Sequence, residues 1–163
     1  MVEATLPQKT CERKKPARWP IIESMTESER QRLFEIARDV LLAEFPHVSA
    51  IYVYGSFARG EEWPDSDLDL AVLLPPERRI GDLLDVIRKL SEGLRRRVDL
   101  IDLRKVGDVL RREVLADGHT LFVSNPQAVL SWEASAMSRY ARHREEIKDI
   151  LDDFKRTGIG YAG

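Results

Sequence analysis

The sequence predicts an α/β (α+β) fold, in which a small mixed β-sheet is flanked by helices and followed by a long C-terminal helix. Short apolar strand patterns at 50–54, 68–74 and 98–103 alternate with stretches of helical apolar spacing. The segment between the second and third strands is long enough to contain a crossover helix. With 163 residues, 43% of them hydrophobic and 33% charged, the chain can bury the core of one soluble domain.

The folded domain is expected to begin at Thr26. Residues 1–25 combine a cluster of Lys and Arg with three prolines and lack hydrophobic periodicity, which is typical of a flexible basic arm. Thr26 and Glu29 have the spacing of a capping box, and apolar residues at helical spacing follow them. The first helix is therefore predicted to run to about Glu44.

Two strands and the loop between them form the expected edge of a functional site. Ala50–Tyr54 is rich in β-branched and aromatic residues and stops at Gly55. Leu68–Leu74 is a second apolar strand, ended by two prolines. Helical apolar spacing over Ile80–Leu94 then predicts a crossover helix that leads to the strand Val98–Leu103.

A short helix and a short strand complete the predicted core. Apolar residues from Val109 to Leu115 mark the helix. Gly118 follows it and is suited to the left-handed position after a helix C-terminus. The segment His119–Val123 is predicted to return as a strand.

Residues 124–156 are expected to form the C-terminal helix, followed by a flexible tail at 157–163. Ser124 or Asn125 can serve as the N-cap, and Pro126 suits the first helical position. The helix is mostly charged on one side and carries an apolar stripe on the other. This stripe is expected to pack on the core or in a bundle, with a protein-binding surface as the alternative. Its members are Val129, Leu130, Trp132, Met137, Tyr140, Ile147, Ile150, Leu151 and Phe154.

Asp67 and Asp69 carry the strongest chemical signal in the chain. Side chains two residues apart on a strand share a face, so these carboxylates should point together while Leu68 and Leu70 enter the core. Like charges at that distance repel unless a cation lies between them. Mg²⁺, which prefers oxygen ligands and binds together with substrate phosphates, is the usual solution. Taken alone, such a pair is more often a solvated surface feature.

The segment Gly55-Ser56 supplies an independent signal. Gly55 ends the first strand at a point where a side chain would block the approach of a ligand to the backbone. Ser56 offers a hydroxyl, and a short helix beginning near Phe57 would offer free N–H groups to an anion. Together with the carboxylate pair, this segment predicts a metal-nucleotide site.

These small and acidic residues have a characteristic spacing. The motif consists of Gly55-Ser56, Ala58-Arg59-Gly60, Ser66 and Asp67-Leu68-Asp69. It resembles the minimal nucleotidyltransferase family of the DNA polymerase β superfold, with agreement at about ten positions, and the resemblance spans roughly residues 30 to 123. It implies a nucleotidyltransferase domain over residues 26–123.

The resemblance also implies a third carboxylate from a later strand, and two candidates are present. Asp99 and Asp102 lie on opposite faces of the predicted strand Val98–Leu103. Asp99 occupies the Val-Asp-Leu position at which similar proteins carry the acid, and Asp102 is the alternative. The family implies that Asp67 and Asp69 hold two Mg²⁺ ions, and that Asp99 binds one of them and accepts or orients the proton of the attacking hydroxyl.

The remaining site residues implied by the family bind the nucleotide. ATP would be the substrate, with Gly55 and Ser56 against its β- and γ-phosphates. Arg59 could neutralise a phosphate or pair with an acid to fix the loop. Attack by an acceptor hydroxyl on the α-phosphate would release pyrophosphate.

Other polar residues near the motif have weaker claims to function. The acids Glu61, Glu62 and Asp65 match no ligand spacing in the family and are interpreted as solvated loop residues. His119 and His143 lack a Cys or His at metal-ligand spacing, which argues against a zinc site.

Composition narrows the possible functions. The net charge of −2 argues against a large direct nucleic-acid interface. The single cysteine, Cys11, excludes an intramolecular disulfide and fits a reducing cytoplasm. Neither an apolar run of membrane-spanning length nor a signal-type apolar core is present in the sequence, so we expect no membrane association.

Chains of this size and layout resemble the antitoxins of HEPN–MNT toxin–antitoxin pairs. That resemblance implies transfer of AMP from ATP to a tyrosine of a HEPN RNase toxin, which silences the toxin. The N-terminal extension of roughly 25 residues departs from the bare family core. Two alternatives are a non-catalytic antitoxin that acts by occlusion and a small-molecule nucleotidyltransferase of the aminoglycoside-modifying type.

Overall fold

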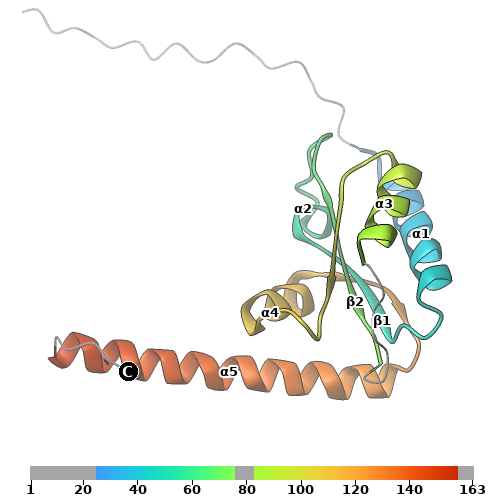
Figure 1. Cartoon of the computed structure of the whole chain (residues 1–163). Helices are drawn as coiled ribbons and strands as arrows, with labels where there is room; N and C mark the ends of the chain where they lie inside the picture. Colours follow the sequence, from blue (N-terminus) through green and yellow to red (C-terminus); the bar gives the residue numbers. More distant parts are fainter. Residues whose placement is uncertain (1–24, 76–82, 158–163) are drawn as a thin grey trace, which may run out of the picture.

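The fold is built on one mixed four-stranded sheet, shown in Figure 1. The structure, a computed structural model, describes residues 25–75 and 83–157. The strand order is β3 (Val98–Asp102), β2 (Leu68–Leu73), β1 (Ala50–Tyr54) and β4 (His119–Val123). β1 pairs antiparallel with β2 and β4, whereas β2 and β3 are parallel. The predicted strands and mixed sheet are thus confirmed.

Helices cover both faces of this sheet. On one face, α1 (Glu27–Glu44) and α3 (Leu83–Leu94) enclose a core of aliphatic side chains from every central strand. On the other face, α4 (Asp108–Asp117) and the start of α5 (Pro126–Thr157) pack on a second core. In Figure 1, α1 and α3 accordingly lie on the opposite side of the strands from α4.

The N-terminal caps of the two longest helices form as predicted. At α1, the Thr26 side chain accepts from the Glu29 backbone N–H, and the Glu29 carboxylate accepts from the Thr26 backbone N–H. At α5, the Asn125 side chain accepts from the Ala128 backbone N–H at 3.1 Å, so Asn125 rather than Ser124 is the cap.

Gly118 does not adopt the predicted left-handed conformation. Its φ of −82° and ψ of 162° are those of an extended residue. Glycine is required here for space, because a Cβ would lie 2.4 Å from the Val114 carbonyl oxygen and 2.9 Å from that of Val53. The end of α4 is therefore fixed by close packing on β1 and not by backbone freedom.

The first turns of α5 belong to the core, but the rest of the helix extends away from it (Figure 1). Val129 and Ala136 are almost fully buried. The expected packing of the apolar stripe on the core holds for Val129 and Trp132, which belong to or contact the second core. It does not hold for the exposed members of the stripe, which are Leu130, Met137, Ile147, Ile150, Leu151 and Phe154.

A partly buried hydrogen bond connects α5 to the centre of the sheet. The Tyr52 hydroxyl donates to Glu133 Oε1 at 2.6 Å. Tyr52→Phe should lower the free energy of unfolding by about 1–2 kcal/mol, because it removes a bond to a charged acceptor. Denaturant unfolding measures the loss, and a variant as stable as the parent would show that this contact is not what anchors α5.

Several predictions concern residues outside those described. They are the arm up to residue 24, including Cys11, the start of the crossover helix at Ile80, and the end of the tail. Among the described helices, none is both long and apolar enough to cross a membrane.

Candidate active site

Strand register places two carboxylates side by side. Asp69 of β2 and Asp99 of β3 are direct partners in the parallel pairing, so both side chains point to the α4 face. On the other side of Asp69, its partner in β1 is Tyr54. The three polar side chains therefore form a row across the sheet, at the end where β1 stops and β2 and β3 begin.

Gly55 lies against this row. It follows β1, opens the short helix α2 (Gly55–Arg59), and has a φ of +69°, which L side chains rarely adopt. A Cβ on Gly55 would lie 2.1 Å from Asp69 Oδ2. A glycine is needed at this position for two separate reasons, the backbone angle and the approach of the Asp69 carboxylate.

Asp67 lies just before β2 and contacts an arginine. Its Oδ1 is 2.7 Å from Arg97 Nε, but the angles are not those of a hydrogen bond, and this oxygen is buried without a hydrogen-bond donor. The Arg97 side chain is 80% exposed, so it can leave this contact at little cost in packing. Asp67 thus has one oxygen that is held only by a displaceable ion pair.

The electrostatics of Asp69 favour a neutral form or a bound cation. Burial, followed by the charges of Asp99, Asp67 and Glu113, raises the pKa of Asp69 to about 6, while the charge of Arg59 opposes this shift. Burial, followed by Asp99 and Asp69, also raises the pKa of Tyr54. The row of side chains is therefore short of positive charge.

Asp102, the alternative third carboxylate, lies elsewhere. It is paired in register with Val72 on the α1 face of the sheet, and its side chain is fully buried. Arg104 donates to both of its carboxylate oxygens at 3.1–3.2 Å, and the Arg104 backbone N–H adds a further bond. Of the two predicted candidates, the structure brings only Asp99 next to Asp69.

Arg59 lies at the end of α2, close to the carboxylates. Its Nε donates to Glu61 at 2.9 Å, and its Nη1 is 3.8 Å from Glu113 of α4. Hydrogen bonding to Glu61 raises the pKa of Arg59. The side chain is 45% exposed, so these pairs leave it free to reorient toward an anion.

Of the three loop acids that were predicted to be solvated, Glu62 instead has a buried side chain. Glu62 has a side chain only 5% exposed and forms an ion pair with Arg30 of α1 at 2.5 Å, which holds the loop against the helix. Glu61 is exposed and pairs with Arg59, and Asp65 is exposed at the loop tip. The two histidines have different surroundings. His119 Nε2 is 2.7 Å from the Ala58 carbonyl oxygen, whereas His143 is exposed on α5.

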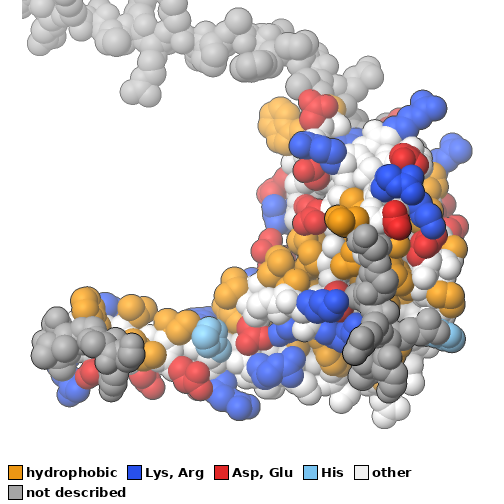
Figure 2. Space-filling view, in the orientation of Figure 1, with side chains coloured by type: hydrophobic (Ala, Val, Ile, Leu, Met, Phe, Trp, Pro, Cys, Tyr) orange, Lys and Arg blue, Asp and Glu red, His pale blue; other side chains and the backbone are white. Residues whose placement is uncertain are grey.

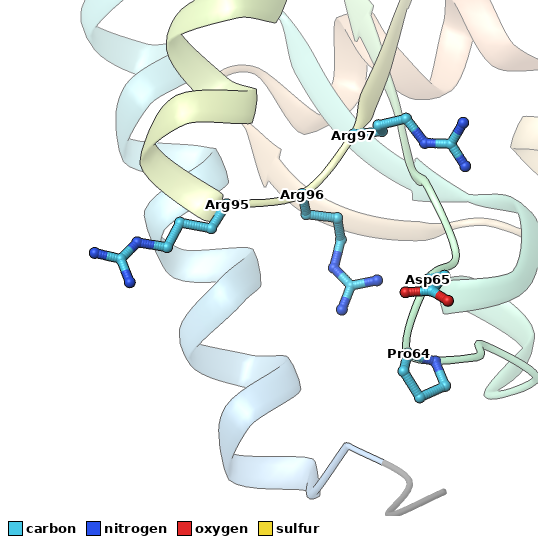
Figure 3. A pocket seen from close by; sticks show the side chains of 5 residues that line it. All are labelled: Pro64, Asp65, Arg95, Arg96 and Arg97. Carbon is cyan, nitrogen blue, oxygen red and sulfur yellow. The ribbon is translucent and has the colours of Figure 1, made fainter.

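A pocket of about 460 Å³ lies between the loop residues Pro64 and Asp65 and the three arginines that precede β3. Figure 3 shows Arg96 directed toward Pro64 and Asp65, while Arg95 and Arg97 point to opposite sides. Arg96 donates to the Ser66 carbonyl oxygen at 2.5 Å and lies over the Phe57 ring. The arginine therefore holds the segment that leads into the Asp67-x-Asp69 motif.

Sequence reasoning missed three residues at the site: Tyr54, Arg97 and Glu113. Tyr54 was assigned only to a strand, although its place directly before Gly55 was a usable signal. Arg97 stands two residues before Asp99, and so shares its face, but the run Arg95-Arg96-Arg97 gave no reason to single it out. Glu113 comes from α4, and its approach depends on tertiary packing alone.

The donor set suits a hard cation. Asp67, Asp69 and Asp99 offer oxygen atoms only, one of them is buried without a donor, and the mutual repulsion of the three charges would be relieved by a divalent ion. Within residues 25–75 and 83–157, however, no three acidic, His or Cys side chains are already gathered around one point. Mg²⁺ binding would therefore require small side-chain movements, including release of Arg97.

The raised pKa of Asp69 predicts a pH dependence of stability. An aspartate titrates near 3.8 when unperturbed, and here near 6, so between these values the folded state holds more protons than the unfolded state. The stability gained from the protonated Asp69 is fully present below pH 3.8 and is lost as the pH rises to about 6. Because Asp69 is partly exposed, we expect a loss of about 1 kcal/mol. Unfolding curves of the parent chain and of Asp69→Asn from pH 4 to 7 test this. If the free energy of unfolding of the parent does not fall relative to that of Asp69→Asn, the prediction is contradicted.

Comparisons with known proteins agree with this geometry. The model of the family described as "Polymerase beta, Nucleotidyltransferase" matches residues 39–127. The protein adenylyltransferase MntA of Shewanella oneidensis is 30% identical over 135 residues, an alignment covering 79% of this chain and 89% of that protein.

Solved structures give the same result. A toxin–antitoxin structure with AMP-PNP matches with a TM-score of 0.66 and 27% identity, covering 75% of this chain and 98% of the other. A tri-AMPylated Shewanella oneidensis HEPN toxin in complex with its MNT antitoxin gives a TM-score of 0.63 and 26% identity, covering 77% and 98%. The chain therefore belongs to the polymerase β-type nucleotidyltransferase family.

Proposed function

We propose that this protein is the antitoxin of a HEPN–MNT pair, a protein adenylyltransferase that moves AMP from ATP to a tyrosine of its HEPN RNase toxin. The observation that carries the proposal is the Asp69–Asp99 pair with Gly55 against it, since this arrangement suits phosphoryl transfer. The similarity to MntA and to the toxin-bound MNT antitoxin supports the choice of a protein acceptor.

In this proposal the three carboxylates have distinct tasks. Asp67 and Asp69 would hold two Mg²⁺ ions, and Asp99 would contribute to the binding of one of them. When bound, the ions neutralise charge on the triphosphate and lower the pKa of the attacking hydroxyl. Arg97 moves from Asp67 to solvent or to a phosphate, because its guanidinium would compete with a cation at Oδ1.

The nucleotide is held by the segment after β1. We assign the β- and γ-phosphates to the backbone of Gly55 and to Ser56, and we assign Arg59 to the same phosphates once it leaves Glu61. The missing Cβ at Gly55 lets a phosphate lie close to the backbone. Charge on the leaving group then falls near a guanidinium that was previously paired with a surface acid.

The chemical step exchanges one P–O bond for another. The tyrosine oxygen of the toxin forms a bond to the α-phosphorus of ATP, and the bond from that phosphorus to the oxygen bridging to the β-phosphate breaks. Pyrophosphate leaves with the bonding electrons. Asp99 accepts the phenolic proton, for which its exposed position at the start of β3 is suitable. The toxin gains a negative charge that repels an RNA backbone.

The two alternative functions have less support. The acidic loop that could have bound a cationic drug has partners of its own, since Glu61 pairs with Arg59 and Glu62 with Arg30. Inhibition by occlusion alone would not explain why a glycine stands where its missing Cβ lets the Asp69 carboxylate lie against the backbone. We place the ATP-dependent reaction in the cytoplasm, with no direct binding of nucleic acid.

Labelled ATP separates the three functions. The chain is incubated with α-labelled ATP, Mg²⁺ and the product of the neighbouring reading frame, with and without a chelator. Label on that protein, lost with the chelator, is the expected result. Tight binding without label would establish occlusion, and label only on a cationic small molecule would establish the drug-modifying activity.

A further inference from the structure

The projecting part of α5 carries an apolar face that no described residue covers. Its large hydrophobic side chains are between 37% and 53% exposed, and those furthest from the core are Ile150, Leu151 and Phe154. In Figure 2 the projecting arm shows hydrophobic side chains gathered along the edge that faces the concave side of the molecule. Apolar side chains in such a row are typical of a surface that binds another protein.

The spacing of these residues is that of a coiled-coil seam. Leu130, Met137 and Leu151 fall on one position of a seven-residue repeat, which Arg144 shares. Tyr140, Ile147 and Phe154 fall on the second seam position. A repeat of this kind presents a narrow stripe that fits one further helix lying along it. A helical occupant is therefore favoured over an extended peptide or a flat surface.

Charges beside the stripe oppose pairing with a second copy of this chain. Lys148 and Lys155 occupy the position that flanks the seam on one side. In an antiparallel pair these lysines would meet the same residues of the second copy, and in a parallel pair Arg144 would face itself across the seam. Acidic residues of α5, such as Glu145 and Asp149, lie away from the stripe on the opposite side of the helix wheel.

We propose that the exposed stripe of α5 docks an amphipathic helix of the toxin partner, one that carries Asp or Glu beside its own apolar seam. This inference rests on the proposed function, from which the partner is taken. Acidic side chains on that helix would meet Lys148, Lys155 and Arg144, whereas a basic or neutral helix would bring no opposite charge to these cations.

The position of the arm fits delivery of a protein acceptor. In Figure 2 the arm and the body of the molecule border one concave region, and in Figure 1 α2, which begins at Gly55 of the candidate site, lies on the side of the body that faces this region. A toxin held along α5 would fill this region and present a side chain to the carboxylate row. The C-terminal helix would thus select the acceptor, while the sheet edge performs the transfer.

The test compares two double variants of the full chain. Ile147→Ser with Leu151→Ser removes apolar side chains from the stripe, and Glu145→Ser with Asp149→Ser makes the matched change on the polar side. Toxin affinity is measured by calorimetry, and helix content by circular dichroism. We expect the stripe variant to bind the toxin at least about tenfold more weakly and the control to bind as the parent does.

Charge reversal gives a second, independent measurement. Lys148→Glu with Lys155→Glu should weaken toxin binding severalfold and flatten its dependence on salt, because attractive pairs across the seam become repulsive. Unchanged affinity in both the stripe and the charge variants would overturn the proposal. So would light scattering that shows the parent chain to be a dimer and the stripe variant a monomer.

Failure of this inference can be told apart from failure of the proposed function. Binding of ATP with Mg²⁺ to the free chain does not involve α5 and should be the same in all α5 variants. If the parent chain never labels the toxin, the proposed function fails. If the parent labels the toxin and the stripe variant labels it equally well at limiting toxin concentration, only the docking surface is refuted.

Discussion

Asp69→Asn is expected to reduce AMP transfer at least about a thousandfold, since it removes a charge on which both the metal and the nucleotide depend. The amide has nearly the volume of the carboxylate, so the sheet should keep its packing. Transfer is measured as label on the toxin under single-turnover conditions. Asp65→Asn, which neutralises an exposed acid in the neighbouring loop, is the matched control and should retain activity.

The same substitution should stabilise the protein in the absence of metal. At pH 7 the ionised Asp69 is held at a cost, because burial and the charges of Asp99 and Asp67 raise its pKa. Removing the charge should therefore raise the free energy of unfolding by about 1 kcal/mol. Activity lost together with stability would mean that Asp69 supports the fold and not the reaction.

Gly55→Ala is expected to abolish transfer and to lower the free energy of unfolding by about 2–4 kcal/mol. Its Cβ would fall 2.1 Å from Asp69 Oδ2, and the backbone would keep a φ of +69° that alanine disfavours. The carboxylate would have to move from its place beside Asp99. Thermal and denaturant unfolding give the stability change, and the labelling assay gives the loss of activity.

Gly60→Ala is a well-matched control for this prediction. Gly60 has a φ of +67°, and the nearest atom to an added Cβ is Arg30 Nη1 at 3.8 Å. Gly60→Ala should lower the free energy of unfolding by only about 1 kcal/mol, because alanine disfavours the backbone angle, and the variant should remain active. If both alanine variants behaved alike, the contact between Gly55 and Asp69 would have no special role.

The sheet and most helix boundaries followed from local patterns. The capping box at Thr26 and the run Ala50–Tyr54 are determined by neighbouring residues, and the structure confirms them. Gly118 shows where local reasoning ends. A glycine after a helix suggests a left-handed turn, but here contact with the Val53 carbonyl, distant in sequence, is what excludes a side chain.

The site was only partly predictable for a similar reason. Alternation along a strand assigns Asp99 and Asp102 to opposite faces but does not say which face adjoins Asp69. The parallel register of β2 and β3 decides this, and register is a tertiary property. The ion pair between Arg97 and Asp67 likewise depends on how the two strands align.

The C-terminal helix shows a different limit. Its apolar stripe was evident from spacing, but spacing cannot say whether a stripe is covered. The length of α5 exceeds the width of the sheet that it packs on, so only residues up to about Ala136 reach the core.

The central claim is that Asp69 and Asp99 act together to bind a metal-nucleotide complex. Titration calorimetry of a non-hydrolysable ATP analogue, with and without Mg²⁺, tests it most directly. The parent chain and Asp65→Asn should bind the analogue only with Mg²⁺, and Asp69→Asn and Asp99→Asn should lose that binding while remaining folded. Equal, magnesium-independent binding by all four proteins would contradict the claim.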